Sequence, residues 1–224
     1  MNNKKVLFCA ILLIGICIGV ISGAISYLSY TTDEGVVNTF VAAGGGQIID
    51  PDIPDDEDDD YNFNLKESKA TLKEDRTGYD LDSTNKVLSN VYDAAVPGMV
   101  IAKDPRLTVN INDNISAYIF IEILDTTNNN LSYNVTSDWI ELTGVIGNNG
   151  GKVYTYKNSA YIGVEGMEFY EIQILSDNKV KAANNLYDVD IQTEGMQLGK
   201  LELYAYICQS VGFNSATDAF NTVF

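Results

Sequence analysis

The chain has 224 residues, with 14 basic and 31 acidic side chains, a formal net charge of −17 and no histidine. A surface this anionic repels nucleic acid and anionic lipid headgroups, so we expect neither as a partner. The lack of histidine excludes Ser-His-Asp and Cys-His nucleophiles and His-bearing zinc sites. Carboxylate-only catalysis remains formally open, but we expect the protein not to be an enzyme.

The first 26 residues have the pattern of an export signal. Lys4 and Lys5 precede an uncharged apolar stretch that runs from Val6 to Ile25. Small residues then occupy the positions that a signal peptidase reads. We predict a signal peptide over residues 1–26, cleavage between Ser26 and Tyr27, and a secreted product.

Two alternatives stay open at this segment. Ser22 and Ala24 form a second small pair, which places the cut two residues earlier. Left uncut, the stretch serves as a membrane anchor, since about 20 apolar residues suffice to span a bilayer. We therefore expect the membrane as a partner only through an uncleaved segment.

Cysteine usage bears on both compartment and stability. Cys9 and Cys17 lie in the export segment, so Cys208 is the one thiol of the chain that follows it. That chain has no means of forming an intramolecular disulfide, which fits export by a bacterium. We expect Cys208 to be a buried, inert thiol, because no neighbouring Lys lowers its pKa.

Residues 27–43 predict an N-terminal strand that is a candidate donor to another subunit. Its β-branched and aromatic character comes from Val36, Val37, Thr39, Phe40 and Val41. An extended segment on a flexible glycine joint is able to leave its parent and pair with the open sheet edge of a neighbour. The alternative is that it forms the first strand of its own domain.

Residues 44–60 predict a Gly-rich and acidic loop between this strand and the body of residues 61–224. Gly44–Gly46 forms the flexible joint, and the like-charged run after it stays extended through self-repulsion. Asp56, Asp58, Asp60 and Glu67 match positions 1, 3, 5 and 12 of a calcium loop. Because Tyr61 replaces the glycine of position 6, we favour a solvated loop and no cofactor, with calcium binding as the alternative.

From Tyr61 onward, short apolar runs separated by turn signals predict an all-β fold, either a sandwich or a barrel. The predicted strands cover residues 63–67, 99–102, 117–123, 153–156, 170–174, 186–191 and 201–208. The predicted turns and breaks cover Val96–Gly98, Lys103–Pro105, Gly147–Gly151 and Ser176–Asn178, the last two as hairpin loops. Residues 82–93 predict a short helix or an irregular connection, and Ser215–Asp218 resembles the capping box of a C-terminal helix.

The strand over residues 117–123 is apolar on both faces. Ala117, Ile119, Ile121 and Ile123 alternate with Tyr118, Phe120 and Glu122. Such a strand belongs in the middle of a sheet. We expect a helix, a loop or another chain to cover its second face.

Several ordered segments resemble the TasA/camelysin family, exported proteins of Gram-positive bacteria that a SipW-type signal peptidase processes. The segments that carry the resemblance are Ala24–Ser29, Asn38–Phe40, Val96–Pro105, Ser116–Ile121 and Leu203–Phe213. The resemblance implies an antiparallel, jelly-roll-like β-sandwich with one or two short helices. For TasA-like members it also implies biofilm matrix fibres, in which the N-terminal strand of one subunit adds to the next subunit. The long acidic run departs from the family.

We therefore expect a secreted structural protein, a subunit or accessory of such fibres, in the extracellular matrix or on the surface of a Gram-positive bacterium. Its expected partners are further copies of itself or a related matrix protein, and the signal peptidase during export. One alternative is a monomeric cell-surface adhesion module. Another is a metallo-endopeptidase, as described for camelysins, although the chain lacks the usual His-Glu-x-x-His ligands.

Overall fold

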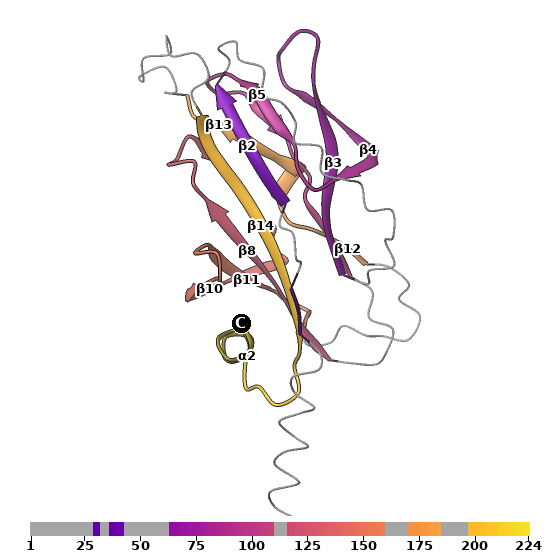
Figure 1. The fold of residues 1–224 in the computed structure, drawn as a ribbon, viewed down its shortest axis with the longest axis vertical. Coiled ribbons are helices and arrows are strands. Elements are labelled where there is room, and N and C mark those ends of the chain that lie inside the picture. The colour runs from indigo at the N-terminus through magenta and orange to yellow at the C-terminus, as the bar shows by residue number, and fades with distance from the viewer. Residues whose placement is uncertain (1–28, 32–35, 43–62, 110–115, 160–169, 185–196) are drawn as a thin grey trace, which may run out of the picture.

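The computed structural model describes residues 29–31, 36–42, 63–109, 116–159, 170–184 and 197–224. These residues form strands arranged in two layers, with one α-helix at the C-terminal end (Figure 1). The expected all-β sandwich of mainly antiparallel strands is confirmed. The predicted export segment, the loop over 44–60 and the strand over 186–191 lie outside the described residues.

A seven-stranded sheet forms the first layer, in the order β10-β11-β8-β14-β2-β5, with β1 also paired to β14. Its strands are β1 (Ser29–Thr31), β2 (Val36–Ala42), β5 (Val91–Ala95), β8 (Ala117–Asp125), β10 (Trp139–Ile146), β11 (Lys152–Tyr156) and β14 (Gln197–Gln209). Neighbours run antiparallel except β2 and β5, which run parallel. The long strands β8 and β14 lie in the middle of the sheet.

Two smaller sheets form the opposing layer. A four-stranded sheet has the order β12-β7-β3-β4, and a three-stranded sheet has the order β6-β13-β9. Their strands are β3 (Phe63–Leu72), β4 (Tyr79–Val87), β6 (Val100–Ala102), β7 (Arg106–Val109), β9 (Leu131–Ser132), β12 (Tyr170–Gln173) and β13 (Lys179–Ala182).

The main core lies between the layers and follows from alternation along the strands. The inward rows are Ala117, Ile119, Ile121 and Ile123 on β8, and Leu201, Leu203, Ala205 and Ile207 on β14. Leu65, Leu107 and Ile172 meet them from the four-stranded sheet, and Ile101 and Val180 from the three-stranded sheet. Each Leu, Ile or Val side chain in these rows contributes roughly 1.5–3 kcal/mol by leaving water, so the rows fix the register of the central strands.

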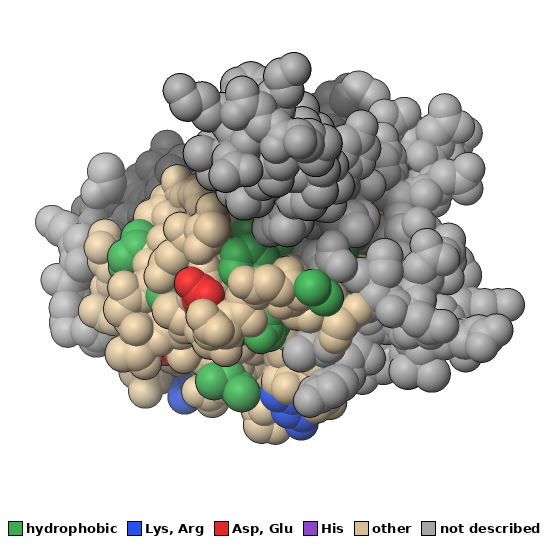
Figure 2. Space-filling model, turned by 90° about the horizontal axis from the view of Figure 1, so that it is seen from below, with side chains coloured by type: hydrophobic (Ala, Val, Ile, Leu, Met, Phe, Trp, Pro, Cys, Tyr) green, Lys and Arg blue, Asp and Glu red, His purple; other side chains and the backbone are tan. Residues whose placement is uncertain are grey.

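The second face of β8 is covered by helix α2 (Ala216–Val223), which confirms that this face is buried. In this smaller core, the ring centroids of Phe120 and of Tyr206 lie 5.0–6.2 Å from those of Phe220 and Phe224. Ser215 caps the helix, since its side chain accepts a hydrogen bond from the Asp218 amide at 3.1 Å, as the capping pattern predicts. Seen from below, the described part of this end shows separate hydrophobic side chains, in green, and few Lys, Arg, Asp or Glu side chains (Figure 2).

The prediction of a helix or an irregular connection over residues 82–93 is wrong. These residues contribute to β4 and β5 instead. The Asp82 carboxylate accepts hydrogen bonds from the amide and hydroxyl of Thr84, within a register shift of the β3–β4 pair. A local Asx turn uses the same residue types as a helix cap, so the sequence signal was real but marked a bulge.

Two predicted turns have different outcomes. Val96–Met99 closes a tight turn through the Met99 amide and the Val96 carbonyl at 3.0 Å, with Pro97 before Gly98 at a φ of 73°, which suits a type II turn. Ser176–Asn178 is not a hairpin loop. It is the short helix η2, and it links β12 to β13, which belong to different sheets.

Candidate functional site

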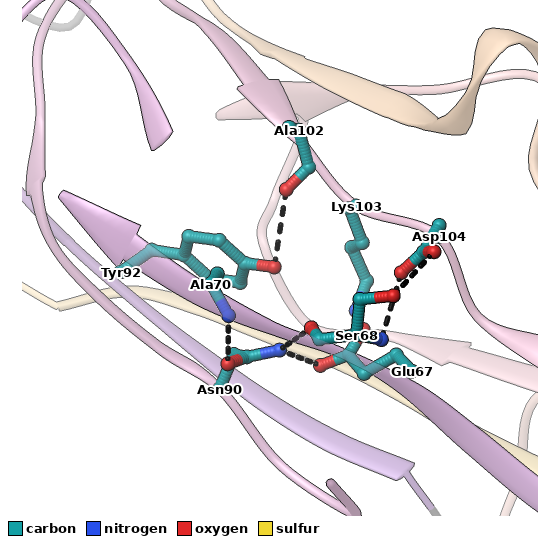
Figure 3. Close-up of polar contacts among 8 residues, drawn as sticks. All are labelled: Glu67, Ser68, Ala70, Asn90, Tyr92, Ala102, Lys103 and Asp104. Atoms are coloured by element: carbon teal, nitrogen blue, oxygen red, sulfur yellow. Dashed lines mark hydrogen bonds and ion pairs between the residues drawn. The ribbon is translucent and has the colours of Figure 1, made fainter. Parts of the chain in front are cut away.

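Five buried polar side chains gather beside β3, and we call them the β3 polar cluster (Figure 3). They are Glu67, Ser68, Asn90, Lys103 and Asp104, each of them buried. Glu67 and Ser68 belong to β3, Asn90 directly precedes β5, and Lys103 and Asp104 directly follow β6. The cluster thus joins three segments that are separate in the sequence.

The centre of the cluster is a fully buried ion pair. Lys103 Nζ lies 2.6 Å from Glu67 Oε2, and both side chains have 0% exposure. Burial raises the pKa of Glu67 and lowers the pKa of Lys103, while each partner opposes the shift of the other. Burial destabilises the charged form of each side chain. The free-energy difference between the ion pair and the neutral acid–amine pair is therefore smaller than it would be in water.

Asn90 donates a hydrogen bond to the other oxygen of the same carboxylate. Its Nδ2 donates to Glu67 Oε1 at 2.7 Å and to the Ser68 carbonyl at 2.9 Å. Its Oδ1 accepts from the Ala70 amide at 2.7 Å. A backbone acceptor on one side and a backbone donor on the other fix the orientation of the amide.

Asp104 holds the neighbouring residue of β3. Its carboxylate accepts from the Ser68 amide at 2.8 Å and from the Ser68 hydroxyl at 2.7 Å. Pro105 favours extended backbone at Asp104, and the Lys103 amide donates to the Asn178 carbonyl at 2.8 Å, which anchors this segment. The Lys-Asp-Pro sequence, which was expected to end a strand, does so and also supplies two members of the cluster.

A second buried carboxylate lies in the first layer. Glu122 Oε1 accepts from the amides of Asn149 at 2.9 Å and Gly151 at 2.8 Å. Glu122 Oε2 accepts from the Tyr206 hydroxyl at 2.5 Å and from Asn149 Nδ2 at 3.1 Å. The predicted hairpin loop Gly147–Gly151 is confirmed between β10 and β11, and Glu122 fixes it onto β8 and β14.

The predicted assembly strand is β2, and its backbone lies inside the first sheet of its own chain. Its antiparallel partner is β14, and its parallel partner is β5. Val36, Val37, Thr39, Phe40 and Val41 are in register with Leu203, Glu202, Lys200, Gly199 and Gln197. In this structure the same chain supplies β2 and both of its neighbours.

The other predicted site residues are not brought together. Ser26 and Tyr27 of the cleavage site, and Asp56, Asp58 and Asp60 of the possible calcium loop, lie outside the described residues. Glu67 is described, and its carboxylate is engaged with Lys103 and Asn90. A calcium site would therefore have to form from the acidic run without Glu67.

Within the described ranges, no group of three or more Asp, Glu or Cys side chains is arranged to hold a metal ion. In the same part of the chain, no helix has the length and apolarity needed to cross a membrane.

Cys208 is predicted to be unreactive while the protein is folded. It is buried in the smaller core, and burial raises the pKa of its thiol to about 11. At pH 8 its thiolate fraction is therefore about 100-fold below that of an ordinary thiol. Labelling of the chain from Tyr27 onward with a thiol reagent should be at least ~100-fold slower than after denaturation in urea. Equal rates in the two states would contradict this burial.

Sequence reasoning did not identify the β3 polar cluster, although one signal was present. Phe63, Leu65 and Glu67 share one face of β3 by alternation, and Leu65 is a core residue. A carboxylate at an inward position needs a buried partner, and the Lys-Asp-Pro motif offered a lysine. Asn90 gave no comparable signal, because its position depends on a segment that the sequence did not predict as a strand.

Comparison of the chain with family models, with curated proteins and with solved structures finds no match.

Proposed function

We propose that this protein is a secreted structural subunit, or accessory, of extracellular matrix fibres in a Gram-positive bacterium, related to the TasA/camelysin family. In this proposal β2 of one subunit fills the sheet of the next by donor-strand exchange. The jelly-roll-like connectivity and the absence of enzymatic activity belong to the same proposal. The support is the sequence resemblance together with the position of β2.

The position of β2 is the observation that carries the proposal. It contributes hydrogen bonds on both sides, to β14 and to β5, although it precedes β5 by almost fifty residues. Removing it would leave one edge of β14 open along the register from Gln197 to Leu203 and would leave β5 without its sheet neighbour. The same strand from another copy would form the same backbone hydrogen bonds with β14 and β5. Exchange therefore keeps these hydrogen bonds and links the subunits.

A disulfide across this ladder tests the exchange directly. Thr39 and Lys200 are register partners, and antiparallel neighbours lie at a distance that a disulfide is able to bridge. In the chain from Tyr27 onward, carrying Cys208→Ala, we expect Thr39→Cys with Lys200→Cys to give a covalent ladder on a non-reducing denaturing gel. The Thr39→Cys single variant is the control and should stop at a dimer.

The monomeric adhesion module is the second candidate, and the pairing of β2 within its own chain favours it. In that case the oxidised double-cysteine variant runs as a monomer with an internal disulfide, and no ladder forms. Electron microscopy gives an independent result. Filaments should disappear when residues 27–43 are deleted, and filaments that persist unchanged would rule out β2 as the linking strand.

A further inference from the structure

We propose that Lys103 and Asn90 become joined by an amide bond in the folded protein, with Glu67 as the acid–base group and ammonia as the product that leaves. The three side chains meet in the β3 polar cluster, where one carboxylate contacts both reacting groups (Figure 3). The bond would cross-link the segment before β5 to the segment after β6. It is independent of whether the protein forms fibres.

The nucleophile is Lys103 Nζ, which lies 2.6 Å from Glu67 Oε2 with no exposure to solvent. An amine attacks only in its neutral form, and burial acts in that direction, since it lowers the pKa of Lys103 and raises that of Glu67. Transfer of one proton from Lys103 to Glu67 gives a neutral amine and a neutral carboxylic acid. Both are better suited to a dry interior than the ion pair is.

The electrophile is Asn90 Cγ, and its surroundings match the charge changes of acyl transfer. The Ala70 amide donates to Asn90 Oδ1 at 2.7 Å, where negative charge develops as the tetrahedral intermediate forms. The leaving nitrogen, Nδ2, is held by Glu67 Oε1 at 2.7 Å and by the Ser68 carbonyl at 2.9 Å. Glu67 is therefore placed to deliver a proton to the group that departs.

The step balances in atoms and charge. A bond forms between Lys103 Nζ and Asn90 Cγ, and the bond between Asn90 Cγ and Nδ2 breaks. The neutral acid of Glu67 first donates its proton to Nδ2, and ammonia leaves as the bond from Cγ breaks. The Glu67 carboxylate formed in this way then accepts the surplus proton of Nζ, which leaves a neutral amide. Glu67 ends in the state in which it began the attack, and no oxidant, metal or cofactor takes part. Reaction requires Nζ to approach Cγ to about 3–3.5 Å, which is a side-chain movement within the cluster.

The setting favours a permanent link over a reversible one. The chain after the export segment has no disulfide available, because Cys208 is its one thiol. The ring of Tyr92 lies over Lys103, with Nζ 5.9 Å from its centroid, so the reacting atoms are shielded by an aromatic wall. A water-excluded site also prevents water from attacking Asn90 Cγ in place of the lysine amine.

Tryptic peptide mass spectrometry of the full-length chain tests the bond. Asn90 and Lys103 lie in the same stretch between the cleavage points after Lys86 and Arg106. Cross-linked Lys103 is not a trypsin site, so we expect a single peptide over residues 87–106 that is lighter than its sequence by one ammonia. Its fragment ions should be missing between residues 90 and 103, because that region is a closed loop.

Glu67→Gln and Lys103→Arg are the matched variants, and both should give the unlinked peptides 87–103 and 104–106 at full mass. If either variant fails to fold, the mass of the wild-type peptide is sufficient to test the proposal. A wild-type peptide 87–103 at its full sequence mass, from protein with a cooperative melting transition, overturns the proposal. The same peptide lighter by one ammonia but still cleaved after Lys103 is a succinimide at Asn90, and this outcome also overturns it.

Discussion

Replacing Lys103 by methionine is expected to lower the free energy of unfolding by about 3–5 kcal/mol relative to wild-type protein in which Lys103 is not joined to Asn90, because it leaves the Glu67 carboxylate buried without its cation. Methionine keeps the apolar stem of the lysine, so packing changes little. The pair has no exposure to solvent, which removes the screening that weakens surface pairs. Urea denaturation followed by circular dichroism measures the loss.

Lys152→Met is the matched control for this substitution. Lys152 Nζ lies 3.3 Å from Glu141 Oε1, but both side chains are largely exposed, so its loss should cost less than about 1 kcal/mol. Adding Glu67→Gln to Lys103→Met should restore most of the stability, since it removes the orphan charge and keeps an acceptor for Asn90. Relative to cross-linked wild type, both variants also lose the stability that the proposed cross-link contributes. The difference in the free energy of unfolding between the single and the double variant therefore reports the effect of the unpaired Glu67 charge alone. No recovery would contradict an electrostatic cause.

The pH dependence of Lys103→Met follows from the raised pKa of Glu67. The folded protein holds this proton more tightly than the unfolded chain, whose pKa is ordinary, so the stability contributed by Glu67 falls as pH rises above about 4.5. Without Lys103 the opposing cation is gone, and the fall becomes steeper. The difference in the free energy of unfolding between Lys103→Met and unlinked wild type should therefore become smaller as the pH falls from about 8 to about 5. A gap that stays constant over this range would point to lost packing.

The central part of the fold was readable from the sequence because burial there is periodic. The rows led by Ile119 on β8 and Leu203 on β14 lie in the core as their alternation predicts. The opposite row of β8, with Phe120, lies under α2, and its aromatic character indicated that a cover was needed. Here local pattern and tertiary packing agree.

The sequence failed where local and tertiary signals share the same residue types. Asp82 suits a helix cap and an Asx turn equally, and only pairing with β3 decides between them. Ser176–Asn178 suits a hairpin and a crossover equally, since a short turn does not specify the sheet that follows. The β3 polar cluster was hidden for a related reason, because Asn90 and Glu67 are 23 residues apart and meet only through the fold.

Glu122 supports the second large prediction. Replacing it by leucine should cost about 4 kcal/mol or more, because the amides of Asn149 and Gly151 and the Tyr206 hydroxyl all lose a buried acceptor worth roughly 1–3 kcal/mol each. The loop is built closely around the carboxylate, since a Cβ at Gly147 would overlap it. We expect the β10–β11 hairpin to open locally, which amide hydrogen exchange at Asn149 and Gly151 would report before global unfolding.

Two tyrosines of β14 provide a matched test of the same contact. Tyr206→Phe keeps the ring, which lies 5.5 Å from Phe220, and removes a hydroxyl that donates to a buried carboxylate, so we expect a loss of about 1.5–3 kcal/mol. Tyr204→Phe removes a hydroxyl that donates to Glu202 at a partly exposed position, and it should cost less than about 1 kcal/mol. Faster exchange at Gly151 should accompany only the first substitution. Equal losses for the two variants would show that Glu122 does not hold the hairpin, because the buried and the exposed hydroxyl would then contribute alike.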